Sequence, residues 1–177
     1  MNDQLKMKTI TKDTIREYGT LSGRTDSFDD NTEMGVFCKF LKNTRPDLTV
    51  VPKPYGPYGV DVAYKDGDDY VAFFDLERCG KWKNDWPSNW RCLSFLDRKS
   101  KYLKYPEFGM VWFSNDLSKF VISWKKDIVK YPVSKRHMPS GEVDLVRKVD
   151  FSCGTLIGTK FGKRDIEIFS NRQEFKL

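Results

Sequence analysis

The feature that most constrains this chain is a β-hairpin whose second strand runs directly into acidic residues. The segments 59–64 and 70–77 are short and rich in aliphatic and aromatic residues, and an Asp-Gly pair between them is typical of a hairpin turn. Asp75 and Glu77 stand at the end of the second strand, two positions apart. Because side chains alternate along a strand, both carboxylates project from the same face. The hairpin therefore predicts a negatively charged patch on one face of a sheet.

A third acid, Asp61, lies in the first strand of the hairpin and extends this patch. An antiparallel pairing sets Asp61 opposite either Phe73 or Asp75, and in both registers the three acids share one face. Carboxylates within roughly 5–8 Å of one another repel, which raises the pKa of a carboxyl group among them. A divalent cation relieves this repulsion, and carboxylate oxygens are the ligands that Mg²⁺ prefers. The sequence therefore predicts a Mg²⁺ site, with Mn²⁺ as a substitute.

Helical and extended patterns alternate around this hairpin. Residues 30–45 carry a helical apolar stripe that ends before Pro46, and Asp30 with Glu33 three positions later matches the capping-box pattern. The other expected elements are helices at 9–18 and 92–105 and strands at 48–52, 108–116, 119–129, 154–161 and 164–170. The order helix, three strands, helix and strand therefore follows residue 30, and a strand-rich tail completes the chain.

This order, with GVD at 59–61 and FFDLE at 73–77, resembles the PD-(D/E)xK nuclease superfamily, whose core has the order α-β-β-β-α-β. The resemblance covers residues 30–115. It implies an α/β (α+β) fold with a mixed central β-sheet flanked by helices, a restriction-endonuclease-like core with a C-terminal β extension. We expect a single domain over 1–177, with an N-terminal arm at 1–29, the nuclease-like core at 30–126 and a β-rich extension at 127–177.

The resemblance also implies roles for individual residues. Asp61 would be the metal-binding aspartate of the first half-motif, although Val60 stands where the family has proline. Asp75 would take the (D/E) position, and Glu77 stands where the family usually has its catalytic lysine. Glu33 matches the helical glutamate that some members add to the metal site. Some members draw the lysine from the following helix, and the candidates here are Lys99 and Lys101, with Lys81 and Lys83 closer in sequence.

Each acidic residue also has an ordinary structural interpretation. Asp75 and Glu77 can pair with Arg78 or Lys81 where the strand reaches solvent. Glu33 can act only as the capping-box residue of its helix. Asp61 can be a loop-edge acid that hydrogen-bonds the turn before it. These alternatives remain open at the level of sequence.

Charge and aromatic residues point to a nucleic-acid partner. Residues 1–80 hold 11 Lys and Arg against 14 Asp and Glu, whereas residues 81–177 hold 20 against 11. A basic second half suits a polyanion such as DNA. Trp82, Trp86 and Trp90 recur every four residues among basic and amide side chains, so they either stack on unpaired bases or form a core-facing stripe. The expected nucleic-acid-binding residues are Lys81, Lys83, Trp86, Arg91 and Arg98.

Together these patterns predict a Mg²⁺-dependent endonuclease that hydrolyses DNA. Asp61, Asp75 and Glu77 would hold the metal, and one of the lysines would orient the attacking water or neutralise developing charge. A catalytically inactive nucleic-acid-binding module is the alternative, and a protein-interaction domain with a basic face is a third. No apolar run is long enough to span a membrane, so we expect a cytoplasmic protein without a membrane partner, in a host cytoplasm if its origin is a phage or mobile element. A homodimer is an option, because nucleases of this type often pair.

Overall fold

The computed structural model describes residues 29–175, so the helix expected at 9–18 and almost all of the expected arm lie outside the described residues. The helices are α1 (Glu33–Thr44), α2 (Lys125–Ile128) and α3 (Lys163–Ile168), with 3-10 helices η2 (Asp97–Lys104) and η3 (Phe151–Cys153). The strands are β1 (Thr49–Pro52), β2 (Val62–Asp66), β3 (Asp69–Cys79), β4 (Leu93–Leu96), β5 (Phe108–Ser114), β6 (Lys119–Trp124), β7 (Val133–His137), β8 (Val143–Val149), β9 (Gly154–Gly158) and β10 (Asn171–Glu174).

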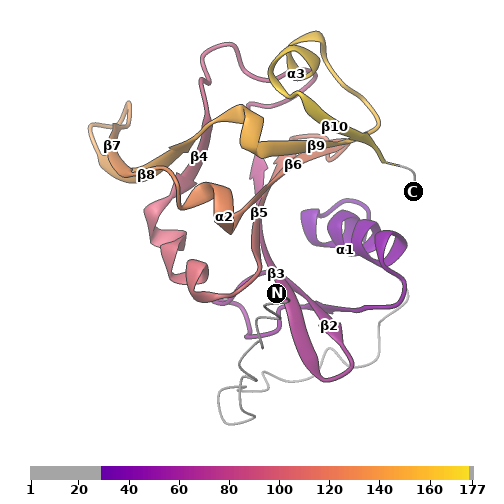
Figure 1. Ribbon diagram of the computed structural model, residues 1–177. Coiled ribbons are helices and arrows are strands. Elements are labelled where there is room, and N and C mark those ends of the chain that lie inside the picture. The colour runs from indigo at the N-terminus through magenta and orange to yellow at the C-terminus, as the bar shows by residue number, and fades with distance from the viewer. Residues whose placement is uncertain (1–28, 176–177) are drawn as a thin grey trace, which may run out of the picture.

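A mixed seven-stranded sheet with the order β1-β2-β3-β5-β6-β9-β10 forms the centre of the fold. The pairs β3/β5 and β9/β10 are parallel and the other neighbours are antiparallel. Helix α1 covers one face, and the three-stranded sheet β4-β8-β7 lies on the other side (Figure 1). The expected α+β class with a mixed central sheet is confirmed. The tail divides between the two sheets: β7 and β8 join β4 in the smaller sheet, whereas β9 pairs directly with β6 of the central sheet.

Apolar side chains that alternate along the central strands fill both faces of the sheet. On one face Phe74, Phe113 and Phe120 surround Phe37 of α1, and the ring centroids lie 5.0–6.3 Å from that of Phe37. On the other face Phe73 and its neighbours join the tryptophan segment and the second sheet. Burial of alternate residues on two faces fixes the strand register, since a slip by one residue would exchange the two sets.

The start of α1 differs from the expected capping box. Thr32 is the N-cap, and its hydroxyl accepts a hydrogen bond from the Gly35 amide at 3.0 Å. Asp30 instead pairs with Lys39, and both side chains are solvent-accessible. The prediction was wrong by two residues because threonine at 32 serves the same capping chemistry as aspartate.

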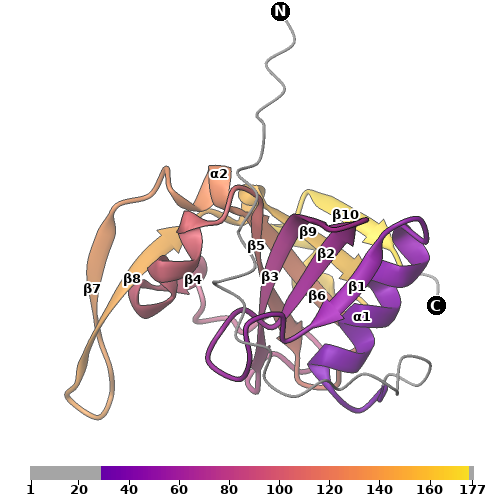
Figure 2. The ribbon, with the colours of Figure 1, turned by 90° about the horizontal axis from the view of Figure 1, so that it is seen from below.

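The second half of the structure differs from the expected elements in several places. The helix expected at 92–105 is the strand β4 followed by η2, because Leu93, Phe95 and Leu96 are buried and their segment pairs with β8. The strand expected at 164–170 is wrong, since Lys163–Ile168 is helix α3. The β7–β8 hairpin was not predicted, and it extends away from the rest of the fold in both ribbon views (Figures 1 and 2).

No helix among residues 29–175 is both long and apolar enough to cross a membrane.

Candidate functional site

The β2–β3 pairing brings two of the predicted acids together. Val62 pairs with Phe74, and the Asp61 amide donates to the Phe74 carbonyl at 3.0 Å. Extending the register by one residue sets Asp61 opposite Asp75, one of the two positions expected from sequence. Asp75 and Glu77 alternate with residues that face α1, so all three acids lie on the face away from that helix. The predicted shared face is confirmed.

Asp75 is the most deeply placed acid of this group. It is 5% exposed and lies in a central strand, with Met110 of the parallel strand β5 as its neighbour. Burial raises the pKa of the Asp75 carboxyl above its ordinary value. The Lys99 ammonium opposes this shift, and the neighbouring Asp61 carboxyl reinforces it. The Lys99 ammonium therefore favours the ionised form of Asp75, which burial and the neighbouring Asp61 carboxyl disfavour.

Lys99 reaches the acids from η2. Its ammonium nitrogen lies 2.6 Å from Oδ2 of Asp75 and 3.1 Å from Oε2 of Glu77. The Lys99 side chain is only 15% exposed. Burial by itself lowers the pKa of Lys99, but the two carboxylates outweigh that effect and the pKa is raised. Lys99 is therefore a charged, fixed cation that bridges Asp75 and Glu77 of β3.

Asp61 has a separate set of partners. Its carboxylate pairs with the Lys53 ammonium, and its Oδ2 accepts a hydrogen bond from the Leu76 amide at 2.8 Å. The Lys53 amide in turn donates to the Asp61 carbonyl at 2.7 Å, which closes the loop between β1 and β2. Asp61 is thus both a loop-closing residue and a member of the acidic face. The sequence analysis missed Lys53, whose backbone has a φ of 47°.

A tyrosine joins η2 to the loop beside the acids. The Tyr102 hydroxyl lies 3.3 and 3.2 Å from the carbonyl oxygens of Tyr58 and Gly59. Burial raises the pKa of the Tyr102 phenol, and the carboxylates of Asp75 and Asp61 add to the shift. Tyr102 therefore lies within electrostatic reach of both acids. No sequence signal distinguished it from the other aromatic residues of the core.

Glu33 does not belong to this group of acids. Its Oε1 accepts from Nε of Arg78 at 2.5 Å. Arg78 follows Glu77 in β3, so its side chain projects from the opposite face, toward α1. The expected role of Glu33 as a fourth metal ligand therefore does not fit the structure. The alternative in which Arg78 pairs with Asp75 and Glu77 is also wrong, since Arg78 binds Glu33 and Lys99 binds Asp75.

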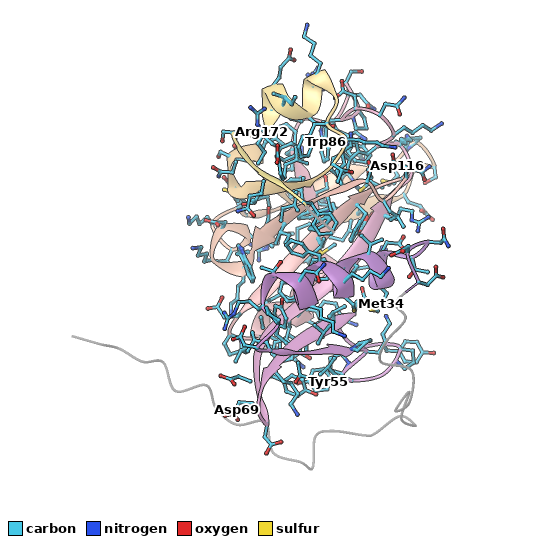
Figure 3. All side chains as sticks on the ribbon, turned by 90° about the vertical axis from the view of Figure 1, so that its right-hand side faces the viewer. Met34, Tyr55, Asp69, Trp86, Asp116 and Arg172 are labelled. Carbon is cyan, nitrogen blue, oxygen red and sulfur yellow. The ribbon has the colours of Figure 1, made fainter. Side chains whose placement is uncertain are left out.

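The tryptophan segment forms part of the core. Trp82 and Trp86 are 0% and 2% exposed, and Figure 3 shows Trp86 among the side chains beneath α3. The Trp82 indole donates to Oδ1 of Asp165 at 2.9 Å, and Trp86 meets Phe169 edge to face. Stacking on a base needs an exposed ring face, so the expected role of Trp86 in nucleic-acid binding does not fit the structure. The core-facing alternative is correct.

The predicted cations divide into one partly buried side chain, that of Lys99, and several exposed ones. Lys101 is exposed, and its ammonium lies 4.9 Å from the centre of the Tyr102 ring, so Lys99 rather than Lys101 reaches the acids. The exposed cations that remain accessible to phosphate groups are Lys81, Lys83, Arg91 and Arg98.

The Cys38 and Cys79 thiols are buried, which raises the pKa of each to about 12 and makes a thiolate role unfavourable.

The donor chemistry of the acidic face suits a hard divalent cation, although its side chains now pair with lysines. Asp61 and Asp75 offer adjacent carboxylate oxygens, and two carboxylates with several waters are enough for Mg²⁺. Within residues 29–175, no three Asp, Glu, His or Cys side chains are grouped closely enough to hold a metal ion by themselves. Any metal here would therefore complete its coordination with water and a substrate oxygen.

Comparisons with protein-family models, with curated proteins and with solved structures found no match to this chain.

Proposed function

We propose that this protein is a metal-dependent nuclease that hydrolyses DNA phosphodiester bonds. One observation carries the proposal: Asp61, Asp75 and Glu77 share a face, and Lys99 of η2 contacts Asp75 and Glu77. Nuclease sites of this kind combine metal-binding carboxylates with a cation near the scissile phosphate. The chain runs α1, β1, β2, β3, β4, η2 and β5, so it follows the order α-β-β-β-α-β of a restriction-endonuclease-like core except for the additional strand β4 and the 3-10 helix η2 in place of the second α-helix.

In this proposal each residue has a task set by its position. Asp61 and Asp75 would hold Mg²⁺ or Mn²⁺, which when bound lowers the pKa of a water ligand and polarises the phosphate. Lys99 stays protonated because the acids of β3 raise its pKa, so it places a fixed positive charge near the developing negative charge. Glu77, with its side chain 36% exposed, is the acid that a substrate or solvent molecule reaches most easily.

A pair of substitutions on one strand tests this proposal. Asp75→Asn preserves the shape of the side chain but removes the charge needed for a metal. Asp69→Asn is the matched control, because Asp69 is exposed at the start of the same strand, at the tip of the hairpin (Figure 3). We expect Asp75→Asn to abolish Mg²⁺- or Mn²⁺-dependent cleavage of labelled DNA, with Asp69→Asn retaining wild-type rates.

Folding has to be separated from chemistry in this comparison. Thermal unfolding of both variants shows whether Asp75→Asn remains folded at the assay temperature, and DNA binding in Ca²⁺ shows whether the interface survives. An Asp75→Asn protein that cuts as fast as wild type, after a second purification excludes contaminating nuclease, would refute the catalytic proposal.

One observation favours a second candidate, a nucleic-acid-binding module without catalysis. Each acid already has a lysine partner, Lys53 at Asp61 and Lys99 at the other two. Two lysines offset most of the negative charge of the three acids, so the site can fold without a metal. DNA binding that persists in EDTA, with every substrate intact after prolonged incubation in Mn²⁺, would select this candidate over the nuclease.

A further inference from the structure

The loop between β1 and β2 exposes a tyrosine beside the acidic face. Tyr58 is 86% exposed, whereas Val143, the next most exposed large apolar side chain of the described residues, is 50% exposed. Tyr58 precedes Asp61 by only three residues. The exposed ring of Tyr58 is open to solvent and is therefore accessible to a planar ligand such as a nucleic-acid base.

The backbone beneath Tyr58 is held in place by several independent contacts. Lys53 and Gly56 have positive φ values of 47° and 79°, and the amides of Gly56 and Gly59 close successive turns at 3.1 and 3.2 Å. A Cβ at Gly59 would lie 2.8 Å from Cβ of Tyr55, so glycine is required there. The Tyr55 ring stacks on Tyr105 with an interplanar angle of 5°. The loop therefore presents Tyr58 from a firmly built base.

Helix η2 links this loop to both the acids and an exposed cation. The Tyr102 hydroxyl lies 3.3 Å from the Tyr58 carbonyl, and the exposed Lys101 lies over the Tyr102 ring at 4.9 Å. Lys99 of the same helix contacts Asp75. The backbone that carries Tyr58, the exposed Lys101 and the acidic face are therefore all connected to one short helix. Aromatic side chains next to cations are the usual means of holding an unpaired nucleotide, by stacking on the base and pairing with its phosphate.

We propose that Tyr58 stacks on an unpaired base of the DNA strand that lies across the acidic face. This inference rests on the proposed function and names its substrate class: DNA with unpaired bases at the cleavage position, such as single strands, flaps or gaps. Tyr58 takes the stacking role that the sequence pattern assigned to Trp86. In this arrangement the loop positions the base, Lys101 contacts a phosphate, and the adjacent phosphodiester lies against Asp61 and Asp75.

Two binding measurements with three variants test the proposal. Fluorescence anisotropy in Ca²⁺ compares a labelled single strand with a blunt-ended duplex of two fully complementary strands. We expect Tyr58→Ala to weaken single-strand binding about 5- to 150-fold, the range that loss of one base–aromatic stack produces, and to change duplex binding less than about twofold. Tyr58→Phe keeps the ring and should bind like wild type. Val143→Ala, which removes a distant exposed side chain, is the matched control.

A spectroscopic measurement reports the stack directly. The fluorescence of 2-aminopurine in the single strand should fall when wild type or Tyr58→Phe binds, and this quenching should be lost with Tyr58→Ala. A Tyr58→Ala protein that binds single strands as tightly as wild type, or that loses duplex and single-strand affinity equally, would overturn the inference.

The same experiment separates this inference from the proposed function. Wild-type cleavage together with unchanged Tyr58→Ala binding and quenching rejects the stacking role and leaves the nuclease proposal intact. Tyr58-dependent binding of single strands without cleavage in Mg²⁺ or Mn²⁺ supports the stacking role and rejects the nuclease. A wild-type protein that binds neither DNA form overturns both.

Discussion

Replacing Lys99 with methionine tests the electrostatics of the acidic face without any assumption about activity. Methionine keeps an unbranched side chain of similar reach and removes only the ammonium group. Among residues 29–175, Asp75, which is 5% exposed, then has no cation in a salt bridge with it, while Asp61 remains beside it. We expect Lys99→Met to lower the free energy of unfolding at pH 7.

The size of this loss follows from burial. Removing one partner of a buried ion pair costs about 3–5 kcal/mol. Asp75 can avoid part of that cost by taking up a proton. At pH 7 this costs at most about 4 kcal/mol, since each pH unit above an ordinary pKa of about 3.9 costs about 1.4 kcal/mol. Glu77 is 36% exposed and loses less, so we expect about 2–4 kcal/mol in total, or roughly 5–15 °C in Tm.

The pH dependence has a definite sign. Without Lys99 the pKa of Asp75 in the folded protein rises further above its unfolded value, because burial and Asp61 are no longer opposed. Between those two pKa values the folded state binds more protons than the unfolded state, so the stability of the variant falls as pH rises. The difference from wild type should therefore be largest near neutral pH and shrink as pH falls toward 4.

Urea unfolding at pH 7 and pH 4.5 measures both effects, and Lys101→Met is the matched control on the same helix. Lys101 is exposed, so its replacement should change the free energy of unfolding by less than about 0.5 kcal/mol. The double variant Lys99→Met/Asp75→Asn should recover part of the loss, because the uncompensated charge is gone. A Lys99→Met loss below about 1 kcal/mol, or one that is equal at the two pH values, would refute this reasoning.

Three further substitutions test which residues stabilise the fold. Thr32→Ala should lower the free energy of unfolding by about 1 kcal/mol, because Thr32 caps α1, whereas Asp30→Ala should change it by less than about 0.5 kcal/mol. Equal losses for the two variants in urea titrations would instead support the capping box with Asp30 as N-cap. Trp86→Ala should lower the free energy of unfolding by about 3–5 kcal/mol through loss of core packing. At a temperature low enough to keep this variant folded, its DNA affinity should equal that of wild type. A folded Trp86→Ala protein with selectively weakened single-strand binding would reinstate its stacking role.

The acidic face could be predicted from sequence because it depends on a local rule. Side chains two apart in a strand share a face, and antiparallel pairing preserves that parity whichever register forms. The positions of Asp61, Asp75 and Glu77 relative to one another follow from this rule alone. Lys99 was one of four candidate lysines, and its selection needed the path of η2 across the sheet. No sequence pattern indicated Lys53, since its contact with Asp61 depends on a loop in which Lys53 itself has a left-handed backbone conformation.

The wrong elements failed because distant contacts decided them. Residues 164–170 alternate like a strand, yet they contain Asp165, which is 0% exposed and accepts hydrogen bonds from Trp82 and Gly162 and pairs with Lys119. These partners lie far away in sequence or appear only after the turn forms. Burial of a charged residue is stable only when every such partner is present, so no local pattern reveals it.

The two lysines at the acidic face, Lys53 and Lys99, differ in how easily a metal cation can displace them. Lys99 contacts two carboxylates with its side chain 15% exposed, whereas Lys53 contacts one with its side chain 37% exposed. Ion pairs with that degree of solvent access contribute about 0–1 kcal/mol, while buried ones resist separation. A divalent cation that needs the oxygens of Asp61 would therefore displace Lys53 at small cost and leave Lys99 in position. The nuclease proposal thus requires one loop side chain to move, and the core beneath Asp75 can remain as it is.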